Sequence, residues 1–258
     1  MPMNLIILRS SPDWLNYDLE RSREFIRDMN LPEDLVIEFA ALWKRHFRVD
    51  YRSVRAQLKA LALQTYKKAR GAVLLRHEAW DGSADSEGRI AFVDDDDWMS
   101  PGVFESLPAR TSDEEGVRWG GLRLGRVFAE GGYSVPIIQR RPLDRTVYTN
   151  NYAVTPRALH RLGRAAFFVH TSAQRSFDRP DFALSTSEQY LSCAVKHPCC
   201  IMSIKYLMSL DGFRADPRRE LSSFMEAVDA MRLEDIAEWV REPFARFRAI
   251  MADAVEPR

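Results

Sequence analysis

The chain has 258 residues, of which 46% are hydrophobic and 29% charged, and its 37 basic side chains balance 37 acidic ones. This is the composition of an ordinary globular protein, long enough for one large α/β domain or two small ones. The zero formal net charge argues against a nucleic acid held by bulk electrostatics, and no apolar stretch approaches the roughly 18 residues of a transmembrane helix.

The cysteines indicate a reducing compartment. Cys193, Cys199 and Cys200 are odd in number and form no Cys-X-X-Cys pair, so neither a disulfide framework nor a zinc site is expected. Residues 1–8 lack the basic start and the long apolar core of a signal peptide. We therefore expect a cytoplasmic protein, with peripheral association at the inner membrane as a further option.

The first part of the chain predicts one strand followed by helices. Asn4 to Leu8 is a short apolar run typical of a buried strand, and Arg9-Ser10-Ser11 follows at its carboxyl end. Helical patterns cover residues 17–29, 32–47 and 52–69. Thr65 and Tyr66 belong to the apolar stripe of the third helix, which we interpret as packing. A second strand is expected over residues 72–75.

Four consecutive aspartates, Asp94 to Asp97, stand directly after the apolar run Ile90 to Val93. That run favours a buried strand, so the acids lie at a strand's carboxyl end, where open α/β sheets bind their ligands. Two carboxylates about 6 Å apart repel by roughly 3 kcal/mol at an effective dielectric near 20. A divalent cation would relieve this repulsion. Mg²⁺ or Mn²⁺, completed by substrate phosphates and waters, suits carboxylate ligands better than Zn²⁺.

A structural role is the alternative interpretation of the aspartates. Ser100 and Pro101 suit the cap and the first position of a short helix over residues 101–107, and the aspartates would then form an acidic loop at its start. Four acids directly after an apolar strand are a poor way to build such a cap, so we favour the ligand-binding interpretation.

The segment from Phe92 to Trp98, with Pro101 behind it, resembles the metal-binding DXD segment of GT-A-fold glycosyltransferases, especially family 2. The usual form in that family is Phe-Leu-Asp-Ser-Asp-Asp-Trp followed by a Pro. The resemblance implies an α/β, GT-A-like fold with a mixed central sheet flanked by helices and with C-terminal helices. It implies a single domain with a nucleotide-binding half (1–110), an acceptor half (111–212) and a helical extension (213–258).

The resemblance also implies site residues. By position, Asp94 and Asp96 are the two aspartates of the motif, expected to hold Mn²⁺ or Mg²⁺ on the diphosphate of a nucleotide-sugar donor, with Asp95 between them as a further donor contact. Arg9 and Ser10 stand where this family begins to hold the nucleoside. A plain turn after the first strand is the alternative for these two residues.

A second segment, Trp80 to Asp85, resembles the Asp-Asp-Gly-Ser-Thr-Asp with which family 2 enzymes hold the uracil and ribose. In that family the segment lies much further before the DXD, with helices between. We therefore expect a polar loop here, and a nucleoside contact by Asp81 is the alternative.

The second half predicts short strands followed by a helix. The strands cover residues 117–119, 127–128, 135–139 and 146–154. Gly120-Gly121 and Gly131-Gly132 mark turns between them. Thr155, Pro156 and Gly163 suit the N-cap, the first position and the residue past the end of the helix.

Asn150 and Asn151 precede that helix. In the resembling family this segment faces the sugar, so both are expected at the donor or acceptor, and local turn hydrogen bonds are the alternative.

His170 follows the apolar run at 167–169. It is expected as a further metal ligand, because enzymes of this fold commonly bring a late His or acid to the cation; a packing role is the alternative.

The segment Ser187 to Tyr190 resembles the Glu-Asp-Tyr that opens a helix in family 2, so a helix is expected over residues 187–196. In inverting members the base is the Asp, and Gln189 stands in its place. An amide cannot accept a proton at neutral pH, so Glu188 is the catalytic candidate. A neighbour such as Asp178 or Asp181, or a mechanism other than the usual one of the family, is the alternative.

The end of the chain predicts helices. The apolar stretch at 201–210 suits the core or a lid, and amphipathic patterns cover residues 221–231 and 233–252. Pro243 interrupts the last pattern, so a kink or break is expected there.

The function implied is metal-dependent transfer of a sugar from a nucleotide-diphosphate donor, a UDP-sugar being favoured, to a hydroxyl of a glycan or lipid-linked glycan. A catalytically inactive, GT-A-like nucleotide-binding or scaffold protein is the main alternative, in keeping with Gln189. A haloacid dehalogenase-type phosphotransferase also carries Asp-X-Asp after a strand. It has Thr or Val soon after the second Asp, where Trp98 and Met99 stand here.

Overall fold

The computed structural model describes residues 3–9, 32–125, 127–129, 132–134, 138–140, 150–168, 170–231 and 237–257. The chain forms two compact units that alternate along the sequence. Unit 1 takes residues 1–10, 62–123 and 139–194, and unit 2 takes residues 11–61, 124–138 and 195–258. These boundaries differ from the expected divisions at 110 and 212, and a single domain over the whole chain stays a prediction.

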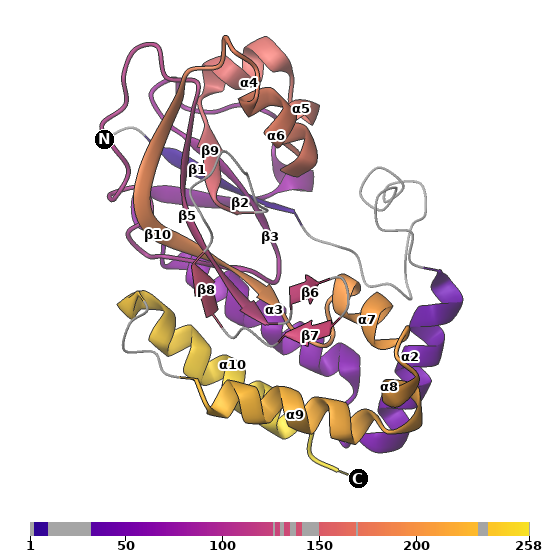
Figure 1. The fold of residues 1–258 in the computed structure, drawn as a ribbon. Helices are drawn as coiled ribbons and strands as arrows, with labels where there is room; N and C mark the ends of the chain where they lie inside the picture. Colours follow the sequence, from indigo (N-terminus) through magenta and orange to yellow (C-terminus); the bar gives the residue numbers. More distant parts are fainter. Residues whose placement is uncertain are drawn as a thin grey trace. The chain divides into compact units, whose positions relative to one another are not determined.

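An eight-stranded mixed sheet lies mainly in unit 1 (Figure 1). Its strands are β1 (Asn4–Arg9), β2 (Ala72–Arg76), β3 (Ile90–Asp94), β4 (Trp98–Met99), β5 (Gly116–Gly125), β8 (Ile138–Arg140), β9 (Tyr152–Val154) and β10 (Leu184–Lys196). The strand order is β2-β1-β3-β9-β5-β10-β4, and β8 pairs with β5. β1 is parallel to β2 and β3, whereas β9 is antiparallel to β3 and β5. The predicted α/β class with a mixed sheet is confirmed.

Three helices of unit 1 pack against this sheet: α4 (Pro156–Leu162), α5 (Ala165–Phe168) and α6 (His170–Phe177). Figure 1 shows them grouped together. Alternate apolar residues of the strands, which point to one face, meet the helices in a buried cluster. The cluster includes Leu5, Ile7, Ile90, Phe92, Tyr152, Val154, Phe167 and Phe177. The predicted sheet flanked by helices therefore holds for this unit.

The start and end of α4 follow the predicted pattern. The Thr155 hydroxyl accepts a hydrogen bond from the Ala158 amide at 3.2 Å, and Pro156 is the first helical residue. Gly163 ends the helix with a φ of 83°, a left-handed conformation that glycine adopts without strain.

Unit 2 is largely helical. Its elements are α2 (Glu33–His46), the first part of α3 (Tyr51–Lys67), α7 (Ile201–Leu207), α8 (Asp211–Ala215), α9 (Pro217–Asp229), η2 (Glu238–Val240), α10 (Arg241–Ala254) and the hairpin of β6 (Val127–Ala129) and β7 (Gly132–Ser134). The Phe39 ring lies against Trp43, Tyr51 and Phe213, with ring centroids 5.6 to 5.9 Å apart. In the described part of the chain, no helix is long and apolar enough to cross a membrane.

The structure corrects four predicted elements. Residues 187–196 belong to the strand β10, residues 101–107 form turns, and Gly120-Gly121 lies inside β5. A side chain at Gly120 would come within 2.9 Å of the Tyr190 ring, so this glycine is required by the close approach of β10. Neither a kink nor a break occurs at Pro243, because α10 begins at Arg241 and the first turn has no hydrogen bond for proline to remove.

The prediction of a helix over 187–196 was wrong. The segment contains Tyr190 and Val195, residue types that suit a half-buried pleated surface, and residues 191–195 are buried. Cys193 and Ser192 pair with Trp98 and Met99 of β4. The predicted helix over 17–29 lies outside the described residues.

Candidate functional site

The carboxyl ends of β1 and β3 lie side by side. The two strands are parallel and their register places Arg9 opposite Asp94. The Arg9 Nε atom is 2.9 Å from the Asp94 Oδ1 atom, with the Arg9 side chain 2% exposed and the Asp94 side chain 31% exposed. The first of the four aspartates therefore forms an ion pair with a buried guanidinium from the neighbouring strand.

The four aspartates alternate in exposure. We call residues 94–97 the acidic turn, since β3 ends at Asp94 and β4 begins at Trp98. Asp95 and Asp97 are buried, at 7% and 0%, whereas Asp94 and Asp96 are partly exposed. The two aspartates that correspond to the DXD motif are thus the two that solvent can reach.

The charges of the turn act on Arg9. Burial is the largest single influence on its pKa and lowers it, but the negative charge of Asp94, followed by Tyr152 and Asp97, raises it by more. The pKa of Arg9 therefore lies above its ordinary value, and the guanidinium stays charged. Arg9 also hydrogen-bonds the hydroxyl of Tyr152, which donates to the carbonyl oxygen of Phe167 at 2.7 Å.

Residues of α3 contact the same turn. The Tyr66 hydroxyl donates to the carbonyl oxygen of Asp94 at 2.6 Å, and the Met99 amide donates to the Thr65 hydroxyl at 3.2 Å. Burial raises the pKa of Tyr66 well above its usual range, and Asp97, Asp94, Asp96 and Asp95 raise it further. A phenolate here would face four carboxylates, so Tyr66 remains a hydrogen-bond donor.

Asn150 and Asn151 are buried and bind backbone carbonyls from distant parts of the chain. The Asn150 amide nitrogen lies 3.3 Å from the carbonyl oxygens of both Trp98 and Cys193, which are paired residues of β4 and β10. The Asn151 amide nitrogen donates to the Trp119 carbonyl oxygen at 3.1 Å. These hydrogen bonds reach backbone groups 32 to 52 residues away in the sequence, so they are not the local turn bonds of the alternative interpretation. A sugar contact stays a prediction.

Four further residues were candidates for the site. Glu188 lies within β10 and is exposed, so the expected position at a helix N-terminus is wrong. Ser10 and the side chain of His170 lie outside the described residues, so a nucleoside contact by Ser10 and a third metal ligand at His170 stay predictions. Asp81 is exposed, and its carboxylate accepts the Ser83 amide at 2.8 Å, as expected for a polar loop.

The residues of the acidic turn fit Mg²⁺ or Mn²⁺ only together with substrate oxygens. Among the side chains that the structure describes, no group of three or more His, Cys, Asp or Glu is arranged to hold a metal ion. Mg²⁺ commonly uses one or two carboxylates and completes its shell with phosphates and waters. Asp94 and Asp96, both partly exposed, are suited to that partial role, and Arg9 offsets one of the four carboxylate charges.

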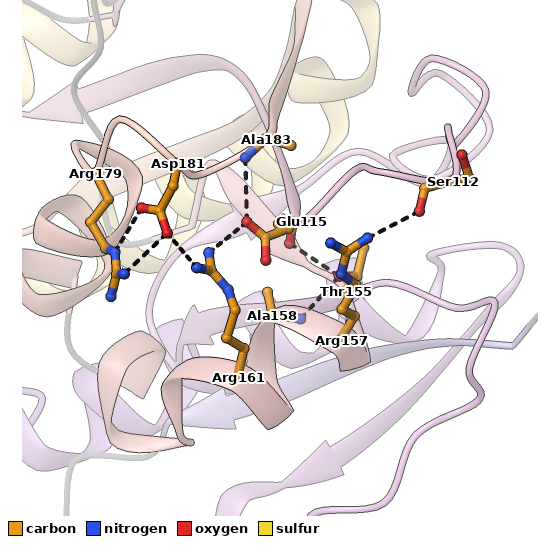
Figure 2. A network of polar contacts seen from close by, with 9 residues as sticks. All are labelled: Ser112, Glu115, Thr155, Arg157, Ala158, Arg161, Arg179, Asp181 and Ala183. Carbon is orange, nitrogen blue, oxygen red and sulfur yellow. Dashed lines mark hydrogen bonds and ion pairs between the residues drawn. The ribbon is translucent and has the colours of Figure 1, made fainter.

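A second polar network joins α4 to the residues before β5 and β10 (Figure 2). Glu115 is 2% exposed, and its carboxylate contacts Arg161 of α4 at 2.6 Å and the Ala183 amide at 3.4 Å. Arg161 also pairs with Asp181 at 2.6 Å, and Arg179 and Arg161 lower the pKa of Asp181 to about 2. The network joins α4 to the start of β5 and to the chain that enters β10. Asp181 therefore forms ion pairs with two arginines, and its lowered pKa makes it a poor proton acceptor.

Three residues of the site were missed by the sequence analysis. Thr65 and Tyr66 were assigned to packing because their spacing matches an apolar stripe, and Tyr152 was assigned to a strand alone. The one available signal was that each carries a hydroxyl at a position predicted to be buried. Buried hydroxyls need partners, but the sequence does not say which ones.

No protein-family model and no curated protein matches the chain. Among solved structures, the crystal structure of S. aureus TarS 1-349 in complex with UDP-GlcNAc is similar at 12% sequence identity and a TM-score of 0.32, covering 99% of this chain and 82% of that chain. The crystal structure of S. aureus TarS 1-349 is similar at 11% identity and a TM-score of 0.30, covering 99% and 81%. Similarities of this size do not establish a shared fold.

Arg9→Met is expected to lower the free energy of unfolding by about 3 kcal/mol, because it leaves Asp94 next to three like charges without its buried partner. Arg70→Met is the matched control. It removes an exposed ion pair with Glu105 in the same unit, so its unfolding free energy should stay close to that of the wild type. Urea unfolding of the wild type and the two variants measures these free energies. Equal losses of stability in both variants would contradict a special role for the ion pair between Arg9 and Asp94.

The raised pKa of Tyr152 predicts that the stability of the protein depends on pH above pH 10. Burial, opposed by Arg9, raises the pKa of Tyr152 to about 12, whereas an unfolded tyrosine titrates near 10. The unfolded chain therefore loses its proton first, and stability falls as the pH rises between these values. From pH 10 to 11.5, the free energy of unfolding of Tyr152→Phe should fall by about 1.5 kcal/mol less than that of the wild type. Parallel stability curves for the two proteins over this range would show that the prediction is wrong.

Proposed function

We propose that the protein is a glycosyltransferase that takes a nucleotide-sugar donor, with the donor diphosphate held at the acidic turn. The observation that carries this proposal is the pair of partly exposed carboxylates, Asp94 and Asp96, at the carboxyl end of a central parallel strand. Open α/β sheets bind ligands at such strand ends. The resemblance of residues 92–98 to the DXD segment supports the choice of a diphosphate.

The negative charge of the acidic turn supports a divalent cation that binds between the turn and the donor diphosphate. A nucleoside diphosphate is itself an anion, so it would be repelled by the carboxylates that remain beside the single guanidinium of Arg9. Mn²⁺ or Mg²⁺ would offset both sets of charges and, when bound, would stabilise the negative charge that develops on the leaving diphosphate. In this proposal Asp94 and Asp96 hold the ion and orient the donor, and the acceptor is a glycan or lipid-linked hydroxyl.

A binding protein without turnover is the second candidate, and one observation favours it. Gln189 stands where the resembling family has its base, and the neighbouring Glu188 lies exposed within a strand. The two candidates differ in a simple measurement: release of UDP from a UDP-sugar in the presence of acceptor glycans. Binding of the UDP-sugar without release of UDP would favour the binding protein.

Calorimetric titration with UDP, GDP, dTDP and CMP, each with and without Mn²⁺, tests the donor site. One nucleotide is expected to bind the wild type only when Mn²⁺ is present, and Asp96→Asn should weaken that binding at least ~10-fold by removing a carboxylate that holds the ion. Asp113→Asn is the matched control, because it removes one negative charge from an exposed loop of the same unit.

The control should bind like the wild type. Failure of all four nucleotides to bind in the presence of Mn²⁺ would overturn the donor-site proposal. Equal weakening by Asp96→Asn and Asp113→Asn would mean that the net charge of the unit matters and that the acidic turn has no special role.

A further inference from the structure

Two consecutive residues of α3 hold the two ends of the acidic turn. Tyr66 donates its hydroxyl to the carbonyl oxygen of Asp94, where β3 ends, at 2.6 Å. Thr65 accepts the amide of Met99, just beyond the turn, at 3.2 Å. The backbone is therefore fixed on both sides of the four aspartates by side chains from one helical turn.

Both residues are buried, and the hydroxyl of each donates a hydrogen bond to a backbone carbonyl oxygen. Thr65 is 7% exposed and donates to the Ala62 carbonyl oxygen at 2.8 Å, which leaves an oxygen lone pair for the Met99 amide. Tyr66 is 1% exposed, so its hydroxyl cannot exchange the Asp94 carbonyl for bulk water. Losing either hydroxyl would leave a backbone group of the turn without this buried partner.

The chain that follows the turn is also tied to the end of α3. The Arg70 amide donates to the Pro101 carbonyl oxygen at 2.8 Å, and the Arg70 side chain contacts Glu105 at 2.9 Å. Contacts from residues 65–70 therefore continue along the chain from Asp94 to Glu105. The position of the turn is set by this helix end as well as by the sheet.

We propose that Tyr66 and Thr65 are positioning residues, which set the spacing of the Asp94 and Asp96 carboxylates and thereby the affinity for a divalent cation with a nucleoside diphosphate. The inference rests on the proposed function of the acidic turn. Neither residue is expected to touch the substrate. They act through the backbone that carries the carboxylates, in the way that outer partners orient metal ligands.

Tyr66→Phe tests the proposal, because it removes one oxygen atom and keeps the ring. Electron paramagnetic resonance of free Mn²⁺, with UDP present and absent, measures binding without any need for turnover. The variant is expected to bind Mn²⁺ and UDP ~10-fold more weakly than the wild type. Tyr51→Phe is the control, since Tyr51 is a buried tyrosine at the start of the same helix, packed edge-on against Phe39.

A second pair of variants keeps the test informative if Tyr66→Phe does not fold. Thr65→Val removes the hydroxyl at nearly constant volume, and Thr65→Ser restores it. Mn²⁺ affinity should fall in the Val variant and recover in the Ser variant, while the thermal unfolding midpoints of the two are compared separately. A role limited to stability would lower the midpoint and leave Mn²⁺ affinity in the folded protein unchanged.

The outcomes separate the two proposals. If the wild type binds neither Mn²⁺ nor UDP, the proposed function fails and this inference fails with it. If the wild type binds both, and Tyr66→Phe and Thr65→Val bind equally well, only the positioning role is overturned. Weaker binding in Tyr66→Phe and Thr65→Val, with normal binding in Tyr51→Phe and Thr65→Ser, supports the inference.

Discussion

The ion pair between the buried Arg9 and the partly exposed Asp94 is the interaction on which the acidic turn depends. Four adjacent carboxylates repel one another, and two of them, Asp95 and Asp97, are withdrawn from water, where the repulsion is stronger. A guanidinium supplied by the neighbouring parallel strand offsets part of this repulsion at 2.9 Å from Asp94. The pairing of β1 with β3 is therefore an electrostatic requirement of the turn as well as a source of backbone hydrogen bonds.

The support of the turn comes from parts of the chain that are far apart in sequence. Arg9 comes from β1, Tyr66 from the end of α3, and Asn150 from the residues before β9. Each contacts a different group: the Asp94 carboxylate, the Asp94 carbonyl and the Trp98 carbonyl. Because these contacts fix the backbone, two carboxylates can remain partly exposed beside two that are buried. A ligand would meet a preformed pair of acids, and little ordering would be needed on binding.

Local patterns predicted the local structure well. The strands at β1, β2 and β3, the cap at Thr155 and the helices α2 and α3 follow from apolar periodicity and capping rules, which depend on neighbouring residues. The strand β10 was missed because its partners, β5 and β4, lie far away in sequence, and ladder pairing overrides a weak helix signal.

The site was only partly predictable for the same reason. The aspartates could be identified from their position after a strand, since that argument needs ten adjacent residues. The partners of the turn could not, because nothing in the spacing of Tyr66 or Asn150 says which carbonyl its side chain will reach. Arg9 was predicted to contact a nucleoside, which stays a prediction, and the structure adds an ion pair with Asp94 that only the register of β1 against β3 reveals.

We propose that the acidic turn binds a divalent cation together with a nucleoside diphosphate. Crystals grown with Mn²⁺ and UDP, measured at a wavelength where manganese scatters anomalously, test this binding most directly. We expect one strong anomalous peak about 2.1 Å from a carboxylate oxygen of Asp94 or Asp96, with the diphosphate on its far side. A peak bound elsewhere, or ordered UDP with no manganese at the turn, would contradict it.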